Sequence, residues 1–168
     1  RKNRFHTIRT TGGLNSFGFY ALSSDNNTVT GSLIRSFGAS AAVLGPDADR
    51  NTISLSTMVS NTVNRYAFYA LGADSNTVTG SYLENSAGYG VGLVAGSDYN
   101  TISQSTVATD GGEANFALYI DDADRNTLAG SSVRNLSGHG ARLSNGADYN
   151  TIILSTLVAQ GDARYGLF

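Results

Sequence analysis

The sequence predicts an all-β fold: a single-stranded parallel β-helix, a solenoid in which each repeat of 24 to 26 residues forms one coil. Three observations lead to this prediction. Asn-Thr followed by an aliphatic residue recurs six times, at spacings of 24, 25, 24, 26 and 24 residues. Asp precedes that Asn and Ser follows it at fixed distances in every copy. Short β-branched runs alternate with turn residues, and the sequence lacks the apolar period of 3.6 residues that marks a helix.

The fixed residues define the coil, and we number them from the Asn as position zero. The Asn column is Asn27, Asn51, Asn76, Asn100, Asn126 and Asn150. Position −2 is always Asp, at Asp25, Asp49, Asp74, Asp98, Asp124 and Asp148. Position +5 is always Ser, at Ser32, Ser56, Ser81, Ser105, Ser131 and Ser155. A degenerate copy with His6 at the Asn position brings the expected total to about seven coils, in one domain over residues 1–168.

Each coil is expected to contain three short strands. The first two place an inward aliphatic residue at positions +2 and +7, and the third precedes the Asp. A leucine-rich repeat has a similar length, but it needs an L-x-x-L-x-L run and a helical return segment. A propeller blade matches only the doubled period of about 49 residues, on which copies reading TVTGS or TLAGS alternate with copies such as TISLST. Both halves of that unit carry the same fixed residues, so the single coil is the repeat.

The fixed polar residues are expected to form ladders along the stack. Strands of successive coils lie about 4.8 Å apart, so equivalent side chains lie over one another. An Asn at a turn can adopt the left-handed conformation and hydrogen-bond to the next Asn. A Ser hydroxyl at +5 can bond between coils where a larger polar group would not fit.

The Asp column has two interpretations, because like charges about 5 Å apart repel by roughly 0.8 kcal/mol per pair even in water. In the favoured one, each carboxylate caps backbone N–H groups of its own turn, with Arg50 and Arg125 offsetting part of the charge. In the other, the column is a row of divalent-cation sites. The Gly-Gly-x-Gly-x-Asp calcium repeat is absent from the sequence, and we expect no metal and no cofactor.

An aromatic stripe precedes the turn in alternate coils. If positions −9 and −7 point inward, positions −10 and −8 point outward, which makes the stripe a candidate interface for a second copy or for sugar rings. Its members are Phe17, Phe19, Tyr66, Phe68, Phe116, Leu118, Tyr165 and Leu167. The inverse assignment exposes Tyr20, Tyr69, Tyr119 and three leucines instead. A bulge that partly buries both sets is a further alternative.

Coils such as residues 88–102, which read GYGVGLVAGSDYNTI, resemble those of the right-handed parallel β-helix superfamily. That superfamily includes pectate lyases, polygalacturonases, phage tailspikes and many bacterial surface proteins. The resemblance covers essentially the whole chain. It implies a right-handed solenoid, and it implies little about function because enzymes, adhesins and rods share this scaffold.

Two motifs look catalytic at first sight. Asp121-Asp122 and Gly138-His139-Gly140 are similar to the acidic pair and the Gly-His-Gly of polygalacturonases. However, Gly138-His139-Gly140 fills the same slot as Gly88-Tyr89-Gly90, the Asn-Thr pairs are followed by aliphatic residues, and Arg-Ile-Lys is absent from the sequence. The coils also carry no long insertion to wall a cleft. We therefore expect no catalytic residues and no enzymatic activity.

The composition narrows the remaining choices. Net charge is −2, charged residues make up 14%, and apolar residues make up 40% without a long apolar run, which argues against nucleic-acid binding and membrane insertion. We expect a non-enzymatic rod at the cell surface or outside the cell, either a filament subunit or a segment of a large surface protein. A glycan-binding adhesin and a polysaccharide lyase or hydrolase are the alternatives.

Self-association, head-to-tail or lateral, is the expected partnership, with polysaccharide as the other candidate partner. The chain begins at Arg1 and ends at Phe168 without a segment that would cap a stack. We expect the coils to continue across both termini, in a second copy or in a longer protein.

Overall fold

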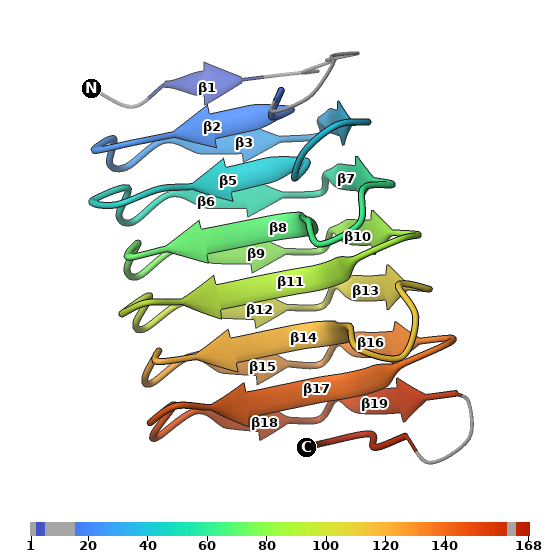
Figure 1. Ribbon diagram of the computed structural model, residues 1–168. Helices are drawn as coiled ribbons and strands as arrows, with labels where there is room; N and C mark the ends of the chain where they lie inside the picture. The colour runs from blue at the N-terminus through green and yellow to red at the C-terminus, as the bar shows by residue number, and fades with distance from the viewer. Residues whose placement is uncertain (1–2, 6–15, 161–163) are drawn as a thin grey trace.

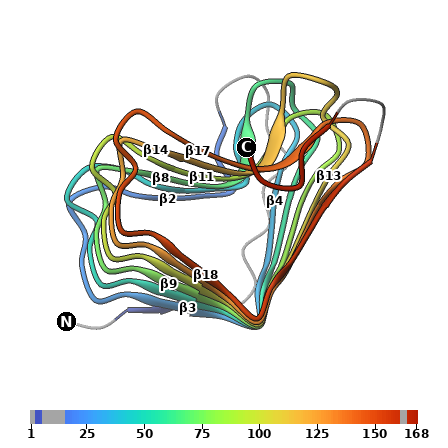
Figure 2. The same ribbon diagram turned by 90° about the horizontal axis from the view of Figure 1, so that it is seen from below.

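The computed structural model describes residues 3–5, 16–160 and 164–168, which form a right-handed parallel β-helix (Figure 1). Viewed along its axis, the solenoid has a three-sided cross-section, with one sheet on each side (Figure 2). The described residues contain no helix, so none could span a membrane. They form six turns, not the seven predicted, with one further strand at the N-terminal end.

The strands of each turn belong to three sheets. The first sheet contains β1 (Arg4–Phe5), β3 (Thr28–Thr30), β6 (Thr52–Ser54), β9 (Thr77–Thr79), β12 (Thr101–Ser103), β15 (Thr127–Ala129) and β18 (Thr151–Ile153). The second contains β4 (Leu33–Ser36), β7 (Thr57–Ser60), β10 (Tyr82–Asn85), β13 (Thr106–Thr109), β16 (Ser132–Asn135) and β19 (Thr156–Ala159). The third contains β2 (Phe19–Ala21), β5 (Ala42–Leu44), β8 (Tyr66–Leu71), β11 (Tyr89–Val94), β14 (Phe116–Asp121) and β17 (His139–Ser144).

The predicted aliphatic columns at +2 and +7 fill the core from the first two sheets. Val29, Ile53, Val78, Ile102 and Leu128 are at most 3% exposed, as are the residues at +7 from Ile34 to Val133. In the last coil, Ile152 and Leu157 are only partly buried. Each side chain packs against its own copies above and below, so the repeat is also the unit of core packing.

The third sheet corrects the predicted face assignment. Phe19, Phe68 and Leu118 lie in one inward column with Ala42, Val91 and Ala141, because the strands pair in that register. Phe68 and Leu118 are each 1% exposed. Tyr20, Tyr69 and Tyr119 point outward instead, so position −7 is inward in one class of coil and outward in the other.

The cause is a difference of one residue in the turn that follows. Five residues separate the last inward residue of the third-sheet strand from the Asn in the coils of Asn27, Asn76 and Asn126, and six in the coils of Asn51, Asn100 and Asn150. In two of the longer turns, two successive residues have positive φ: Ala95 and Gly96, with φ of 52° and 75°, and Asn145 and Gly146, with φ of 53° and 77°. A given position counted back from the Asn therefore falls one residue further along the strand in alternate coils. Since side chains alternate between the two faces, that position is inward in one class of coil and outward in the other.

Two further expectations about the corners are wrong. The left-handed residue is not the Asn but its predecessor at −1, where Asn26, Arg50, Ser75, Tyr99, Arg125 and Tyr149 have φ between 55° and 59°. Asn3, not His6, takes the Asn position of the first copy, because Arg4 pairs with Thr28 and the Asn3 side chain donates to Asn27 Oδ1 at 2.9 Å. His6 itself lies outside the described residues.

Candidate functional site

The Asn column forms a continuous ladder at the corner that leads into the first sheet, which we call the Asn corner. Each backbone N–H from Asn27 to Asn126 donates to the Oδ1 of the next Asn, over 2.8–2.9 Å. Each Asn carbonyl accepts the N–H of a Thr in the next coil, at 2.8 Å. The asparagines from Asn27 to Asn126 are at most 8% exposed, so these bonds satisfy buried polar groups.

The side-chain nitrogen Nδ2 of the Asn column has different hydrogen-bond partners in the two classes of coil. Asn51, Asn100 and Asn150 donate Nδ2 to the carbonyls of Ser24, Ala73 and Ala123, at 2.9 Å. The Nδ2 atoms of Asn76 and Asn126 are buried without a hydrogen-bond partner. Asn27, which belongs to the same class of coil, instead donates Nδ2 to Asn51 Oδ1 at 3.0 Å, so only the two inner members of that class keep an unsatisfied donor.

The Asp column also serves the ladder, although not by capping its own turn as predicted. Asp25 Oδ1 accepts the N–H of Asp49 in the following coil at 3.0 Å, and this bond repeats down to Asp148. Arg50 pairs with Asp25 at 2.7 Å, and Arg125 lies 3.9 Å from Asp124. Burial raises the pKa of Asp74, and the charges of Asp49 and Asp98 add to that rise.

The Ser column repeats the pattern at the next corner. Each Ser N–H donates to the Oγ of the next Ser over 3.1–3.2 Å, and each Oγ donates to the carbonyl two residues before it. In all three polar columns, a side-chain oxygen therefore accepts a hydrogen bond from a backbone N–H of a neighbouring coil. No three His, Asp or Glu side chains gather into a metal-binding group in the part of the chain that the structure describes.

The structure separates the two motifs that look catalytic. His139 opens β17 and pairs with Phe116, whereas Asp121 pairs with Ser144 at the other end of the strand, about 16 Å along it. Asp121 Oδ1 accepts bonds from Ser144 Oγ and Asn145 Nδ2, both at 2.6 Å. Asp122 occupies a left-handed turn position with φ of 51°. The structure therefore does not bring His139 together with Asp121 and Asp122.

The outward side of the third sheet, which we call the outer aromatic face, carries two columns of variable residues. The first column is Phe17, Ser40, Tyr66, Tyr89, Phe116, His139 and Tyr165. The second column is Tyr20, Val43, Tyr69, Gly92, Tyr119 and Arg142. Of the predicted interface residues, this face contains Phe17, Tyr66, Phe116 and Tyr165.

The remaining members of the predicted stripe are not on this face. Phe19, Phe68 and Leu118 pack in the core. Leu167 bridges to the inward residue Ala141 and is exposed beside the last turn. The tyrosines at 20, 69, 89 and 119 complete the face instead. The alternation of shorter and longer turns in the sequence could have identified these tyrosines as outward.

Aromatic rings on this face stack from the third coil to the last. Ring centroids lie 4.8 Å apart between Tyr66 and Tyr89, 6.3 Å between Tyr89 and Phe116, 5.2 Å between Phe116 and His139, and 5.6 Å between His139 and Tyr165. The Tyr66 and Tyr69 rings also stack, at 4.5 Å. Gly92 makes room for them, since a Cβ there would lie 2.6 Å from the Tyr66 ring.

Positive charge borders the lower part of the stack. The Arg142 guanidinium lies 5.4 Å from the centroid of Phe116 and 5.9 Å from that of Tyr119, within range of a cation–π interaction. Burial lowers the pKa of His139, and Arg164 and Arg142 lower it further. Burial raises the pKa values of Tyr66, Tyr69 and Tyr89, so these phenols keep their protons at neutral pH.

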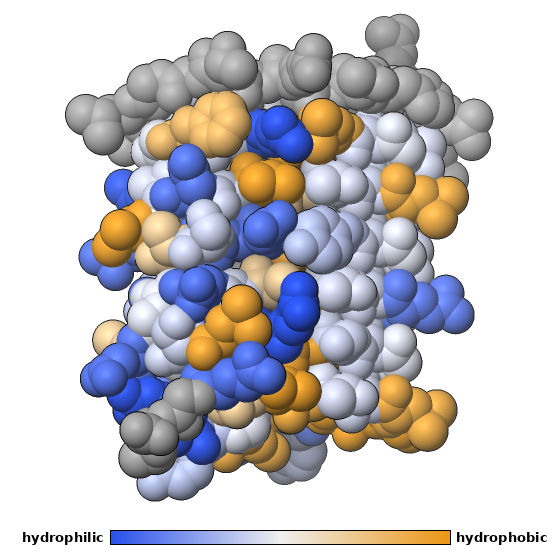
Figure 3. All heavy atoms as spheres, turned by 90° about the vertical axis from the view of Figure 1, so that its right-hand side faces the viewer, coloured by the Kyte–Doolittle hydropathy of each residue, from blue (hydrophilic) through white to orange (hydrophobic). Residues whose placement is uncertain are grey.

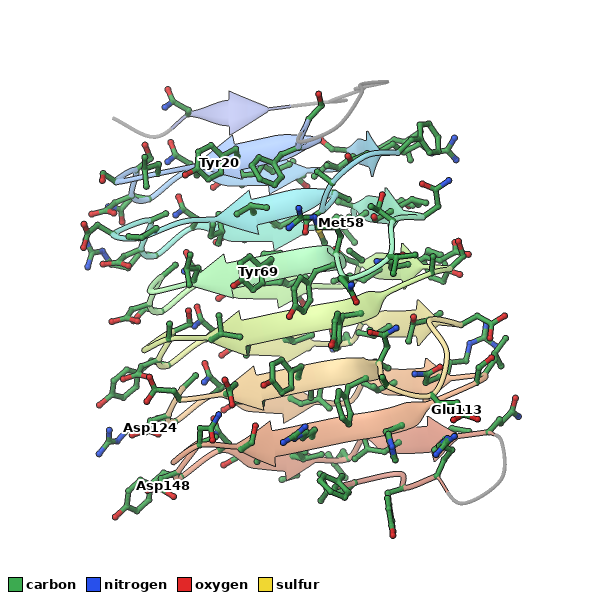
Figure 4. All side chains as sticks on the ribbon, in the orientation of Figure 1. Tyr20, Met58, Tyr69, Glu113, Asp124 and Asp148 are labelled. Carbon is green, nitrogen blue, oxygen red and sulfur yellow. The ribbon has the colours of Figure 1, made fainter. Side chains whose placement is uncertain are left out.

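Two hollows lie on outward sheet faces. One, of about 360 Å³, interrupts the outer aromatic face and is lined by Tyr20 and Tyr69, which are labelled in Figure 4. The other, of about 200 Å³, lies on the second sheet, on the side seen in Figure 3, where hydrophilic and hydrophobic side chains are interspersed. Glu84 and Arg134 flank Ala108 in that second hollow, and Asp110 lines it while accepting a hydrogen bond from Ser137.

Comparison with known families gives a match over most of the chain. Residues 3–162 match the model of a family described as periplasmic copper-binding protein (NosD). No curated protein and no solved structure matches the chain.

Proposed function

The chain belongs to the NosD family, and we propose that it acts outside the cytoplasm as a non-catalytic β-solenoid scaffold. The description of the family as periplasmic supports the location. The rest of the proposal depends on how the chain uses its polar side chains.

One observation carries the scaffold role. The carboxylates, amides and hydroxyls that recur in every coil accept backbone N–H groups of neighbouring coils. An acid–base pair needs two carboxyl groups facing one substrate bond, with one of them left free to exchange a proton. Oxygens committed to an N–H in a buried ladder are poor candidates for that task. The fixed residues are therefore better suited to holding the coils together.

Among the described residues, the side chains that could bind copper do not gather into a copper centre. Copper in proteins prefers Cys, Met and His ligands, and the sequence contains no Cys. Met58 is fully buried among core aliphatics. His139 Nδ1 already accepts the N–H of Tyr165 at 3.2 Å, and Arg142 and Arg164 disfavour a further cation beside it. We therefore do not extend the copper binding in the family's description to the described residues.

Self-association forms part of the proposal. In the last coil Leu143, Ile152 and Leu157 are only partly buried, although their counterparts in the inner coils are fully buried. Residues 165–168 already hydrogen-bond to β17. A second copy stacked on β18 and β19 would cover Ile152 and Leu157 and pair these two strands. Sedimentation velocity over a concentration series should then show growing species. A single species at every concentration would contradict this part.

Two assays on one preparation test the main proposal. Isothermal titration with Cu(I) and with Cu(II) should give no saturable binding tighter than the micromolar range. Incubation with pectin, alginate and cellulose should release no new reducing or unsaturated ends. Cleavage that disappears in Asp122→Asn with His139→Ala, or stoichiometric micromolar copper binding, would overturn the scaffold role.

A further inference from the structure

The outer aromatic face is interrupted at the second coil. The first coil carries Phe17 and Tyr20 there, whose rings lie 5.3 Å apart, and the third carries Tyr66 and Tyr69. Between them, the second coil has Ser40 and Val43 at the two outward positions. The hollow of about 360 Å³ lies over this coil, and we call it the Val43 groove. Figure 4 shows Tyr20 over β2 and Tyr69 over β8, with β5 between them.

We propose that the Val43 groove binds one pyranose ring of a glycan, held between Tyr20 and Tyr69. These residues lie in one outward column with Val43 between them, so the backbones that carry them are two coil steps apart, about 9.6 Å. The hollow of about 360 Å³ lies at the small end of the range for small-molecule pockets, which suits a single sugar ring.

The tyrosines are arranged to leave the groove open. The Tyr20 ring leans over the second coil, since a Cβ on Gly45 would lie 3.1 Å from its hydroxyl and 3.2 Å from its Cε2. Tyr66 and Tyr69 lean in the same direction along the axis, toward Gly92 of the following coil and so away from the groove. Tyr20 is 49% exposed, whereas Val43 beneath it is 5% exposed. The first ring therefore forms a roof, and the hollow remains between the aromatic pairs.

Polar groups border these apolar surfaces, as sugar recognition requires. Arg65 and Asn64 line the groove from the loop before β8, and both are exposed. Asn85 Nδ2 donates to the carbonyl of Arg65 at 2.6 Å, which fixes that loop from the next coil. The phenols of Tyr66 and Tyr69 stay protonated, so they can donate to sugar hydroxyls. Arg65 is the charged residue of the lining, which disfavours a cationic ligand.

The backbone argues against a peptide in this groove. β5 pairs with β2 on one side and β8 on the other, so its N–H and C=O groups are engaged within the sheet. An extended peptide that binds by strand addition needs a free sheet edge. A ligand here meets ring faces and side-chain polar groups, which is the chemistry of a sugar.

Saturation-transfer NMR with three pentasaccharides tests the site: β-1,4-linked glucose, β-1,4-linked N-acetylglucosamine and α-1,4-linked galacturonate. We expect at least one to bind with a millimolar or lower Kd. Val43→Tyr should abolish binding, because it fills the groove with a ring type that the column already carries. Tyr20→Ala should weaken binding by about tenfold, corresponding to the loss of one stacking face.

Tyr119→Ala is the matched control, since Tyr119 lies in the same column but away from the groove, and it should bind within about twofold of the parent. Thermal unfolding of each variant establishes that it is folded. The proposal is wrong if no pentasaccharide binds, if folded Val43→Tyr binds like the parent, or if Tyr119→Ala loses binding equally. Binding of adenosine without any saccharide would also contradict it, because the groove would then take a flat ring.

Discussion

The Asn corner and the outer aromatic face belong to the same coils but use repetition differently. At the corner, the same residues recur in every coil and their polar atoms bond to neighbouring coils. On the outer aromatic face, the second column changes from Tyr20 to Val43, Tyr69, Gly92, Tyr119 and Arg142. Strict repetition therefore marks the residues that hold the solenoid together. Variation at outward positions makes one coil differ from the next, and the proposed glycan site depends on that difference.

The largest expected difference in stability is between two adjacent residues that lie on opposite faces of the third sheet. Phe68→Ala should lower the free energy of unfolding by about 3–5 kcal/mol, because it leaves a cavity in the core. Tyr69→Ala should cost about 1 kcal/mol, mainly the stacking on Tyr66. Urea unfolding of both variants measures the difference. Equal losses would show that the face assignment is wrong.

A smaller contrast distinguishes two members of the Asn column. Asn100→Ala removes the acceptor of the Asn76 N–H and the donor to the Ala73 carbonyl, and should cost about 2–3 kcal/mol. Asn76→Ala removes the acceptor of the Asn51 N–H but also a buried Nδ2 without a partner, so about 1 kcal/mol is expected. Thermal or urea unfolding compares them. A larger loss at Asn76 would refute the difference between the coil classes.

The smallest expected effect concerns the charge of the Asp column. The pKa of Asp74 is raised in the folded state by burial, so its ionisation costs stability as pH rises through that pKa. Asp74→Asn keeps an oxygen for the N–H of Asp98 and removes the charge. The variant should be slightly more stable than the parent at pH 7, and the difference should shrink toward pH 4. Unfolding curves at both pH values test the sign, and a gain that grows on acidification would contradict it.

The sequence was sufficient to predict the solenoid, its period and its polar columns, because residues at a fixed period must stack once one coil forms. The sequence was not sufficient to predict which residues of the third sheet point outward and form the outer aromatic face. A one-residue difference between turns shifts the strand register, and a shift of one residue exchanges inside and outside. Phe68 and Tyr69 are adjacent and both aromatic, so composition could not choose between them.

Two other corrections have local causes. Asn3 precedes Asn27 by 24 residues, so spacing alone could have identified it, but His6-Thr7-Ile8 looks more like the later copies. The left-handed corner falls at residues as different as Arg50, Ser75 and Tyr99, because the stack imposes that conformation regardless of local preference. The Val43 groove depends on strand register and side-chain direction, so it could be recognised only in three dimensions.

The central claim is that the repeated polar residues are a buried ladder, and amide hydrogen exchange tests it most directly. The N–H groups of Asn51, Asn76 and Asn100 should exchange as slowly as those of Val78 and Ile102 in the neighbouring strands, because each donates to a buried side-chain oxygen. Val63, an exposed turn residue, should exchange quickly in the same experiment. If the Asn amides exchanged as fast as Val63, the column would not be a ladder, and the structural role of the repeat would be contradicted.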